Sequence, residues 1–289
     1  MKILVIGGTG SIGIYVSQQL VEAGHDVTVA HRGRMDVAAA APGAKSIVHK
    51  GSLNSSEDFG EFLAASPEVI VHMLALTEAD AIAALHTFRR HIGRMVFASS
   101  GDVYRAYGRF TLLEPGPPEP SPLSAMESPL RSCFYPYRKP TTQFGSLEYN
   151  YEKILVERSF MGKSDMPACC LRLPKVYGKR RNADMATVYG FAGRHNWRWT
   201  HGYVENVAAA IALAATHPDA AGKTYNVGEA ITPTIAERLQ HLPKRHPILQ
   251  NSGTYDFSQD IVYDTTPIRQ ELGYREVVTY EEGLRRTFV

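Results

Sequence analysis

The sequence predicts an α/β protein with a doubly wound parallel sheet and a smaller C-terminal lobe. Short apolar, β-branched segments recur through the first hundred residues, amphipathic segments separate them, and a glycine-rich turn follows the first apolar segment. Strands of a parallel sheet are buried on both faces, and each needs a helical crossover to reach the next. Because these crossovers are right-handed, helices are expected to cover both faces of the sheet.

The expected elements alternate along the chain. The first strands are predicted at Lys2–Gly7, Asp26–Ala30, Ser46–Lys50, Glu68–Leu74 and Arg94–Ser99. The helices between them are predicted at Ser11–Ala23, Ser55–Ala65 and Thr77–His91. Further along we expect, in order, the elements Leu147–Met161 (helix), Ala168–Leu173 (strand), Val204–Thr216 (helix), Lys223–Val227 (strand) and Tyr280–Thr287 (helix). We divide the chain into a main domain, 1–173, and a smaller substrate-binding lobe, 174–289.

A proline-rich segment interrupts this pattern. Eight of the chain's 17 prolines lie between Glu114 and Pro140. Neither a helix nor a central strand tolerates that density of proline. The segment is either a plain surface loop or a lid beside a ligand cleft, since long irregular segments often cover a binding site.

Composition excludes several classes of protein. The 289 residues carry a formal net charge of only +2, with basic residues scattered, which argues against a nucleic-acid binder. Only three cysteines are present, and none has a metal-ligand spacing with a histidine, so we expect no metal and a reducing compartment. The N-terminus offers no signal peptide, and no apolar stretch is long enough to span a membrane. We therefore expect a cytoplasmic protein.

The glycine-rich turn predicts a dinucleotide site. Gly7, Gly10 and Gly13 fit the pattern G-x-x-G-x-x-G, directly after a strand and at the start of an amphipathic helix. Glycine permits the tight turn and lets backbone N–H groups approach a pyrophosphate at the helix N-terminus. Such a loop in this place is typical of a Rossmann domain.

The end of the second strand favours NADP over NAD. NAD sites usually place an acidic residue there to bind the ribose hydroxyls. This chain has His31-Arg32-Gly33-Arg34 at that point, and Asp26 precedes the strand. The Arg32 guanidinium, with Arg34 as a second candidate, would bind a 2′-phosphate. The alternative is that both arginines are solvated surface residues, with NAD as the cofactor.

The pattern Y-x-x-x-K suggests a catalytic phenol and ammonium. On a helix it places both groups on one face, where the cation lowers the tyrosine pKa. The match Tyr135/Lys139 contains one proline and precedes another, so it cannot form a helical turn. The match Tyr149/Lys153 opens a helical pattern and is preferred. Tyr151 misses the pattern because Leu155 occupies its i+4 position.

By these and other motifs the chain resembles the extended short-chain dehydrogenase/reductase family, the NAD-dependent epimerase/dehydratase group. The resemblance covers nearly the whole length. Besides the glycine loop it rests on four internal motifs. Glu68–Ala75 is similar to the family's D-V-V-I-H-L-A-A, Ser99–Tyr104 to S-S-x-x-V-Y, Arg172–Gly178 to R-x-x-x-V-Y-G and Val204–Ala208 to V-x-D-V-A. The segments Ile268–Tyr274 and Tyr280–Leu284 are similar to the C-termini of the family.

The resemblance implies a site. Its catalytic triad would be Ser100, Tyr149 and Lys153 around a nicotinamide. The cofactor would lie against Gly7, Thr9, Gly10, Ser11, Ile12, Gly13, Arg32, Ser52, Leu53, Leu74, Ala75 and Leu173. Candidates for substrate binding are Asp102, Arg138, Arg181 and Tyr203, each of which also suits a structural or solvated role. The family further implies a homodimer and a small-molecule substrate.

Departures from the family pattern shape the functional hypothesis. Dehydratases of the family carry Asp-Glu after the hydroxyl residue, whereas this chain carries Gly101-Asp102. Hydride transfer or epimerisation at a hydroxyl or carbonyl carbon, for instance of a nucleotide sugar, is therefore favoured over dehydration. The alternative is a catalytically silent NAD(P)-binding sensor or an RNA-associated relative. The retained Ser100, Tyr149 and Lys153 favour the enzyme.

Overall fold

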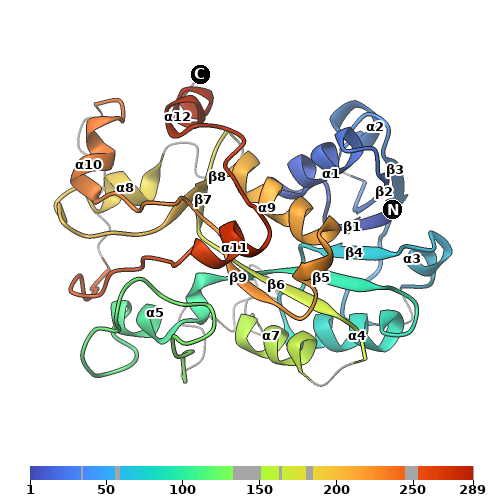
Figure 1. Cartoon of the computed structure of the whole chain (residues 1–289), viewed down its shortest axis with the longest axis horizontal. Coiled ribbons are helices and arrows are strands. Elements are labelled where there is room, and N and C mark those ends of the chain that lie inside the picture. The colour runs from blue at the N-terminus through green and yellow to red at the C-terminus, as the bar shows by residue number, and fades with distance from the viewer. Residues whose placement is uncertain are drawn as a thin grey trace.

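A seven-stranded parallel sheet forms the centre of the molecule (Figure 1). The computed structural model describes residues 1–33, 35–55, 59–132, 151–162, 165–179, 185–244 and 253–288. Within them the strand order is β3-β2-β1-β4-β5-β6-β9. The strands are β1 (Lys2–Ile6), β2 (Asp26–His31), β3 (Lys45–Val48), β4 (Val69–His72), β5 (Arg94–Ser100), β6 (Ala168–Leu173) and β9 (Thr224–Asn226). This confirms the predicted doubly wound Rossmann sheet.

Alternating side chains of the strands build two cores, one on each face of the sheet. On β1, Ile3 and Val5 belong to one buried cluster, whereas Leu4 and Ile6 belong to the other. Successive side chains of a strand point to opposite faces, so a run of four apolar residues serves both cores. The helices covering the first face are α1 (Gly13–Glu22) and α9 (Val204–Thr216), and those covering the second are α3 (Gly60–Ala64), α4 (Glu78–Phe88) and α7 (Lys153–Met161) (Figure 1).

A smaller lobe lies beyond the carboxyl ends of β5 and β6. It contains the two-stranded parallel ribbon of β7 (Lys175–Tyr177) and β8 (His201–Tyr203). Its helices are α5 (Arg105–Phe110), α8 (Ala186–Gly190), α10 (Ile235–Gln240), α11 (Thr266–Glu271) and α12 (Tyr280–Phe288), while α2 (Val37–Ala40) belongs to the main domain. An aromatic cluster fills part of the lobe, where the ring of Phe110 stacks on Trp197 with centroids 4.9 Å apart.

The division at residue 173 cuts through the sheet. β9 pairs with β6, and α9 packs on α1, although both elements follow residue 173. Their sequences explain this, since α9 presents the small residues of Val204–Thr216 to the sheet and is buried along most of its length. A segment this apolar is stable only against a large apolar face, and the sheet provides one.

The helix that carries Lys153 is shorter than predicted. α7 begins at Lys153, and neither Tyr151 nor Glu152 before it is helical. Glu152 is extended, with φ −160° and ψ 97°, and its carboxylate accepts the N–H of Ile154 as an N-cap. The expectation of helix from Leu147 is therefore wrong for the residues directly before Lys153. Residues 147–150 lie outside the described part of the chain.

The described part of the proline-rich segment is anchored to the protein. Leu123 is fully buried, and its N–H donates to the carbonyl of Val262 over 2.7 Å. Arg131 is buried as well and forms an ion pair with Glu152, 2.9 Å between Nη2 and Oε1. The segment therefore closes over the carboxyl end of β5, whereas residues 133–140 lie outside the described ranges.

Candidate active site

The glycine loop between β1 and α1 is too crowded for other residues. Gly7 has φ +84°, a conformation that favours glycine, and its carbonyl accepts the N–H of Gly10 over 3.0 Å. A Cβ atom added at Gly13 would collide with the carbonyl oxygen of Gly7. The first turn of α1 therefore packs directly on the loop, and a helix N-terminus in this place favours an anion such as a pyrophosphate.

A cavity of about 870 Å³ opens next to this loop, along the carboxyl ends of β1, β2 and β4. Its volume lies within the usual range for cofactor pockets. Predicted cofactor residues that line it are Gly7, Thr9, Gly10, Arg32, Ser52, Leu53 and Leu74. The remaining predicted cofactor residues do not line the cavity. Ser11, Ile12 and Gly13 lie at the start of α1, and Ala75 is fully buried. Leu173 ends β6 and pairs with Ser100 of β5.

Arg32 lies at the mouth of this cavity. Its side chain is exposed, and no residue in the described ranges forms an ion pair with it. The neighbouring wall contains His31 and His49, which sequence reasoning missed. His49 is held by a contact of 2.6 Å between its Nδ1 and Oε1 of Glu61. His31 ends β2 and His49 follows β3, so both lie at the carboxyl edge of the sheet. Ligands of such folds bind at that edge, so this position could have identified both histidines from the sequence.

Lys153 is buried near the cavity, two residues before the lining residue Leu155 on α7. Its Nζ donates to the carbonyl oxygens of Ala75 at 2.5 Å and Ala98 at 2.8 Å. Burial lowers the pKa of Lys153 to about 8, although the nearby carboxylate of Asp102 opposes this shift. An ammonium anchored in this way can hold a ribose hydroxyl or influence a neighbouring phenol.

Ser100 and Asp102 stand at the end of β5. Ser100 is partly buried, and its Oγ accepts the N–H of Asp102 over 3.4 Å. Tyr151 Oη donates to Oδ2 of Asp102 over 3.0 Å. Burial raises the pKa of Asp102, against the opposing charge of Arg131. The structure thus brings Ser100, Asp102 and Lys153 to one end of the sheet, and Tyr149 lies outside the described residues.

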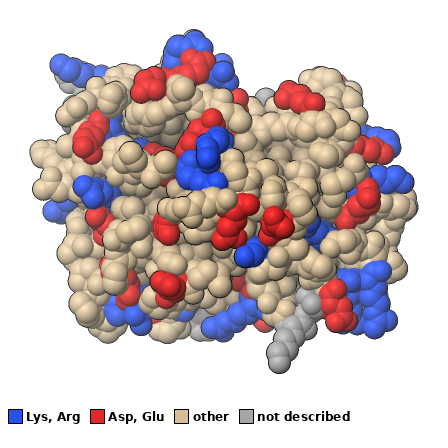
Figure 2. All heavy atoms as spheres, viewed as in Figure 1, with Lys and Arg blue, Asp and Glu red and all other residues tan. Residues whose placement is uncertain are grey.

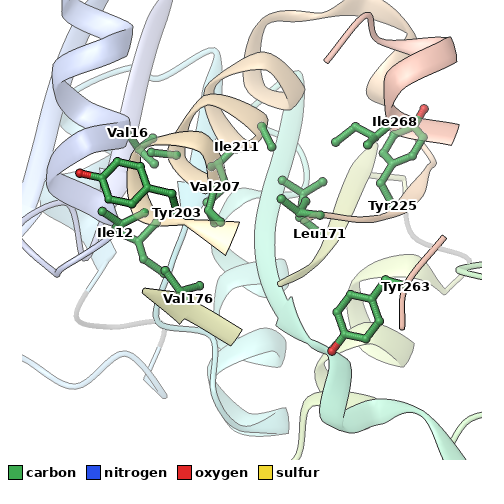
Figure 3. Close-up of a cluster of buried hydrophobic side chains, with 14 of the residues drawn as sticks. Ile12, Val16, Leu171, Val176, Tyr203, Val207, Ile211, Tyr225, Tyr263 and Ile268 are labelled. Atoms are coloured by element: carbon green, nitrogen blue, oxygen red, sulfur yellow. The ribbon is translucent and has the colours of Figure 1, made fainter. Parts of the chain in front are cut away.

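The other predicted substrate residues are placed differently. Tyr203 is buried in the hydrophobic cluster with Ile12 and Val176 (Figure 3), and its hydroxyl donates to Glu205 over 3.0 Å. Its role in the described structure is packing at the start of α9. Arg138 and Arg181 fall outside the described ranges. In the part of the chain that is described, no group of three His, Cys, Asp or Glu residues could hold a metal ion.

The buried Lys153 predicts a pH dependence of stability. Its pKa falls from the usual 10.5 to about 8 on folding, so between these values the unfolded chain binds more protons. The free energy of unfolding therefore rises with pH across that window, and below it the full cost of burying the charge remains. We expect wild type to gain on the order of 3 kcal/mol relative to Lys153→Met between pH 7.5 and 10.5 in urea unfolding. Parallel pH curves for the two proteins would contradict this, because all other titrating groups are common to both.

The fold and the cavity define a dinucleotide-binding α/β protein of the Rossmann type. The sequence model of the NAD dependent epimerase/dehydratase family matches residues 3–228. The chain therefore belongs to that family, which confirms the resemblance inferred from its motifs. In the described ranges no helix has both the length and the apolar character needed to cross a bilayer.

Solved structures with the same fold include several epimerases. UDP-glucose 4-epimerase of Thermus thermophilus, in complex with NAD, aligns over 100% of this chain and 98% of its own, with a TM-score of 0.69 and 21% identity. The enzyme of Stenotrophomonas maltophila with bound NAD and formylated UDP-arabinopyranose gives 0.72 at 16% identity, covering 100% and 97% of the two chains. At such identities these similarities show the fold alone.

One curated relative is similar over a short stretch. It is the chloroplast stem-loop binding protein of 41 kDa b of Arabidopsis thaliana, 29% identical over 113 residues. The match covers 36% of this chain and 30% of that protein, so this chain spans about a third of the length of the relative.

Proposed function

We propose that the protein is an NAD(P)-dependent epimerase or reductase that acts at a hydroxyl or carbonyl carbon of a small metabolite. The observation that carries this is the cavity of about 870 Å³, which has the glycine loop in its wall and the buried Lys153 nearby. A dinucleotide bound along it would place its pyrophosphate at α1 and its nicotinamide toward β5. The cofactor supplies the hydride chemistry, and the protein supplies orientation and charge.

Each catalytic residue has a distinct role in this proposal. Tyr149 exchanges a proton with the substrate oxygen, Lys153 lowers the pKa of that phenol, and Ser100 orients the oxygen by a hydrogen bond. The burial of Lys153, whose Nζ donates to the carbonyl of Ala98 near the end of β5, supports its part in this arrangement. Gly101 stands where dehydratases of the family carry the first of two acidic residues after the hydroxyl residue, which favours hydride transfer or epimerisation over dehydration.

The proposed substrate is a nucleotide sugar or a similar hydroxylated metabolite. Support comes from the structurally similar proteins, which are UDP-glucose 4-epimerases by name. A panel of UDP-sugars incubated with NAD or NADP, and followed by NMR of the sugar carbons, tests the proposal. Conversion of one member supports it. Absence of both conversion and dinucleotide binding would remove it.

We further propose NADP as the cofactor, with Arg32 binding its 2′-phosphate. The exposed guanidinium at the cavity mouth supports this, as does the lack of an acidic residue at the tip of β2. In calorimetric and fluorescence titrations, we expect Arg32→Ala to weaken NADPH binding by roughly 10- to 100-fold and to leave NADH binding nearly unchanged, as for loss of a charge-assisted hydrogen bond.

Arg90→Ala is the matched control for this experiment. Arg90 is exposed just beyond the end of α4 and does not line the cavity. The substitution Arg90→Ala removes the same net charge as Arg32→Ala, so a long-range electrostatic effect on binding would appear in both variants. Equal affinities of wild type for NADPH and NADH would instead favour NAD, the cofactor named in the solved complexes.

A homodimer that forms through α4 and α7 is also proposed. These helices lie side by side on one face of the sheet (Figure 1), and Ile82 on the outer side of α4 is 55% exposed. An apolar side chain at that position suits a helix–helix contact between two copies. Sedimentation velocity measures the mass. We also retain the cytoplasm as the proposed location.

The alternative is a catalytically silent or RNA-binding protein, as the name of the curated relative suggests. Basic and acidic side chains are interspersed over the face shown in Figure 2, without a basic stripe. RNA binding of high affinity usually needs such a stripe, so the charge distribution favours the enzyme. A stem-loop RNA titration at two salt concentrations distinguishes the two.

A further inference from the structure

The hydrogen bond between Tyr151 and Asp102 joins residues 49 positions apart, next to Ser100. Tyr151 is only partly buried, whereas Asp102 is 8% exposed. A partly exposed phenol that donates to a buried carboxylate is arranged for proton transfer between a ligand and the protein. This tyrosine is not part of a Y-x-x-x-K pattern, because Leu155 occupies its i+4 position.

The buried Arg131 fixes both members of this pair. Its Nη2 donates to the Glu152 carboxylate over 2.9 Å, and its Nε donates to the main-chain carbonyl of Asp102. The N–H of Glu152 in turn donates to the carbonyl of Leu76 over 3.1 Å. Because Glu152 is extended and clamped, Tyr151 stands outside α7 and faces the end of β5.

The surroundings of Asp102 suit a carboxyl that changes protonation. The titratable groups that face it are Arg131 from the proline-rich segment, Lys153 from α7, Tyr151, and Tyr263 from the C-terminal segment. Burial raises its pKa toward neutrality, while Arg131 and the hydrogen bond from Tyr151 act in the opposite direction. Removing that hydrogen bond should therefore raise the pKa further.

We infer that Tyr151 contacts the substrate oxygen and that Asp102 is the positioning residue that takes up the phenolic proton. The inference rests on the proposed function, but it gives the proton exchange with the substrate oxygen to Tyr151 in place of Tyr149 and adds Asp102 as the proton acceptor. As the substrate hydroxyl loses its proton to Tyr151 Oη, the original phenolic proton moves to Oδ2 of Asp102. One O–H bond breaks and one forms at Tyr151, so the net change is one proton from substrate to carboxylate. The reverse direction returns it.

The first test needs no substrate. NMR of protein labelled with ¹³C in the aspartate carboxyl groups follows the titration of Asp102, whose signal is assigned by its absence in Asp102→Asn. We expect Tyr151→Phe to raise the pKa of Asp102, and Tyr149→Phe and Tyr225→Phe to leave it unchanged. Tyr225 is a matched control, since its hydroxyl donates to Glu271 over 2.8 Å away from this site. An unchanged Asp102 titration in Tyr151→Phe would overturn the inference.

The second test uses the UDP-sugar that the panel identifies. We expect Tyr151→Phe to lower kcat by roughly 100- to 10,000-fold, the range for loss of a general acid–base group, and Tyr225→Phe to change it less than twofold. Asp102→Asn should remove the fall in activity on the acid side of the pH profile, because that fall reports protonation of the carboxylate. Full activity of Tyr151→Phe would overturn the inference. If no UDP-sugar of the panel were converted, this would count against the proposed function alone. The NMR titration would still show whether the hydrogen bond from Tyr151 controls the pKa of Asp102.

Discussion

Replacing Gly13 with alanine is expected to weaken NADPH binding by roughly 100-fold, which corresponds to about 3 kcal/mol at the upper end of overpacking costs. The new methyl group would collide with the carbonyl oxygen of Gly7 and contact Gly8, both main-chain atoms that cannot rotate away. Either α1 moves back from the loop or the loop changes shape. Each displaces the N–H groups that are proposed to bind the pyrophosphate. Calorimetric titration with NADPH measures the effect.

Gly60→Ala is the control for this substitution. Gly60 begins α3, and an added Cβ would meet nothing within 4 Å. Alanine there should leave binding unchanged and alter the free energy of unfolding by less than about 1 kcal/mol, in the stabilising direction. If Gly13→Ala bound NADPH within twofold of wild type, the loop would not be the pyrophosphate site, and the proposed cofactor position would be wrong.

Substituting Glu157 by glutamine is expected to cause the largest loss of stability. Glu157 and Arg172 form a buried pair, with 2.7 Å between Oε2 and Nη2 and side-chain exposures of 7% and 6%. Removing the negative charge leaves a guanidinium uncompensated in the core, which costs about 3–5 kcal/mol. The melting temperature should then fall by roughly 6–20 °C, measured by calorimetry.

Two further variants test the cause. Glu282→Gln removes a charge from the exposed pairs with Arg285 and Arg286 and should leave the free energy of unfolding nearly unchanged. The double variant Glu157→Leu/Arg172→Met removes both charges of the buried pair, so it should recover much of the loss. If Glu157→Gln were as harmless as Glu282→Gln, the buried pair would contribute nothing to the fold.

Local patterns in the sequence were sufficient for the main domain. All five strands expected in the first hundred residues are present within about three residues of their predicted ends, because a parallel strand needs only a short apolar run. The glycine loop was equally predictable, since three glycines at fixed spacing after a strand define one turn and one helix start. The pairing of β9 with β6 across residue 173 was not predictable in this way, because it depends on a contact between distant segments.

The candidate site was predictable only in part, because it also depends on contacts between distant segments of the chain. Ser100 and Lys153 follow from motifs, and Arg32 follows from its place after β2. The hydrogen bond between Tyr151 and Asp102 does not, because the spacing rule assumed a helical turn before Lys153, whereas the helix begins at Lys153.

Gly101 illustrates the difference between sequence and tertiary structure. In the sequence it stands where dehydratases of the family carry an acidic residue. In the folded chain the Tyr263 hydroxyl occupies the space that a side chain at Gly101 would fill. The sequence by itself determined the sheet, the glycine loop and the family, since these depend on residues close together in the chain. Only the tertiary structure decided which side chains meet around Asp102, because packing, and not spacing, brings Arg131, Tyr151 and Tyr263 to the end of β5.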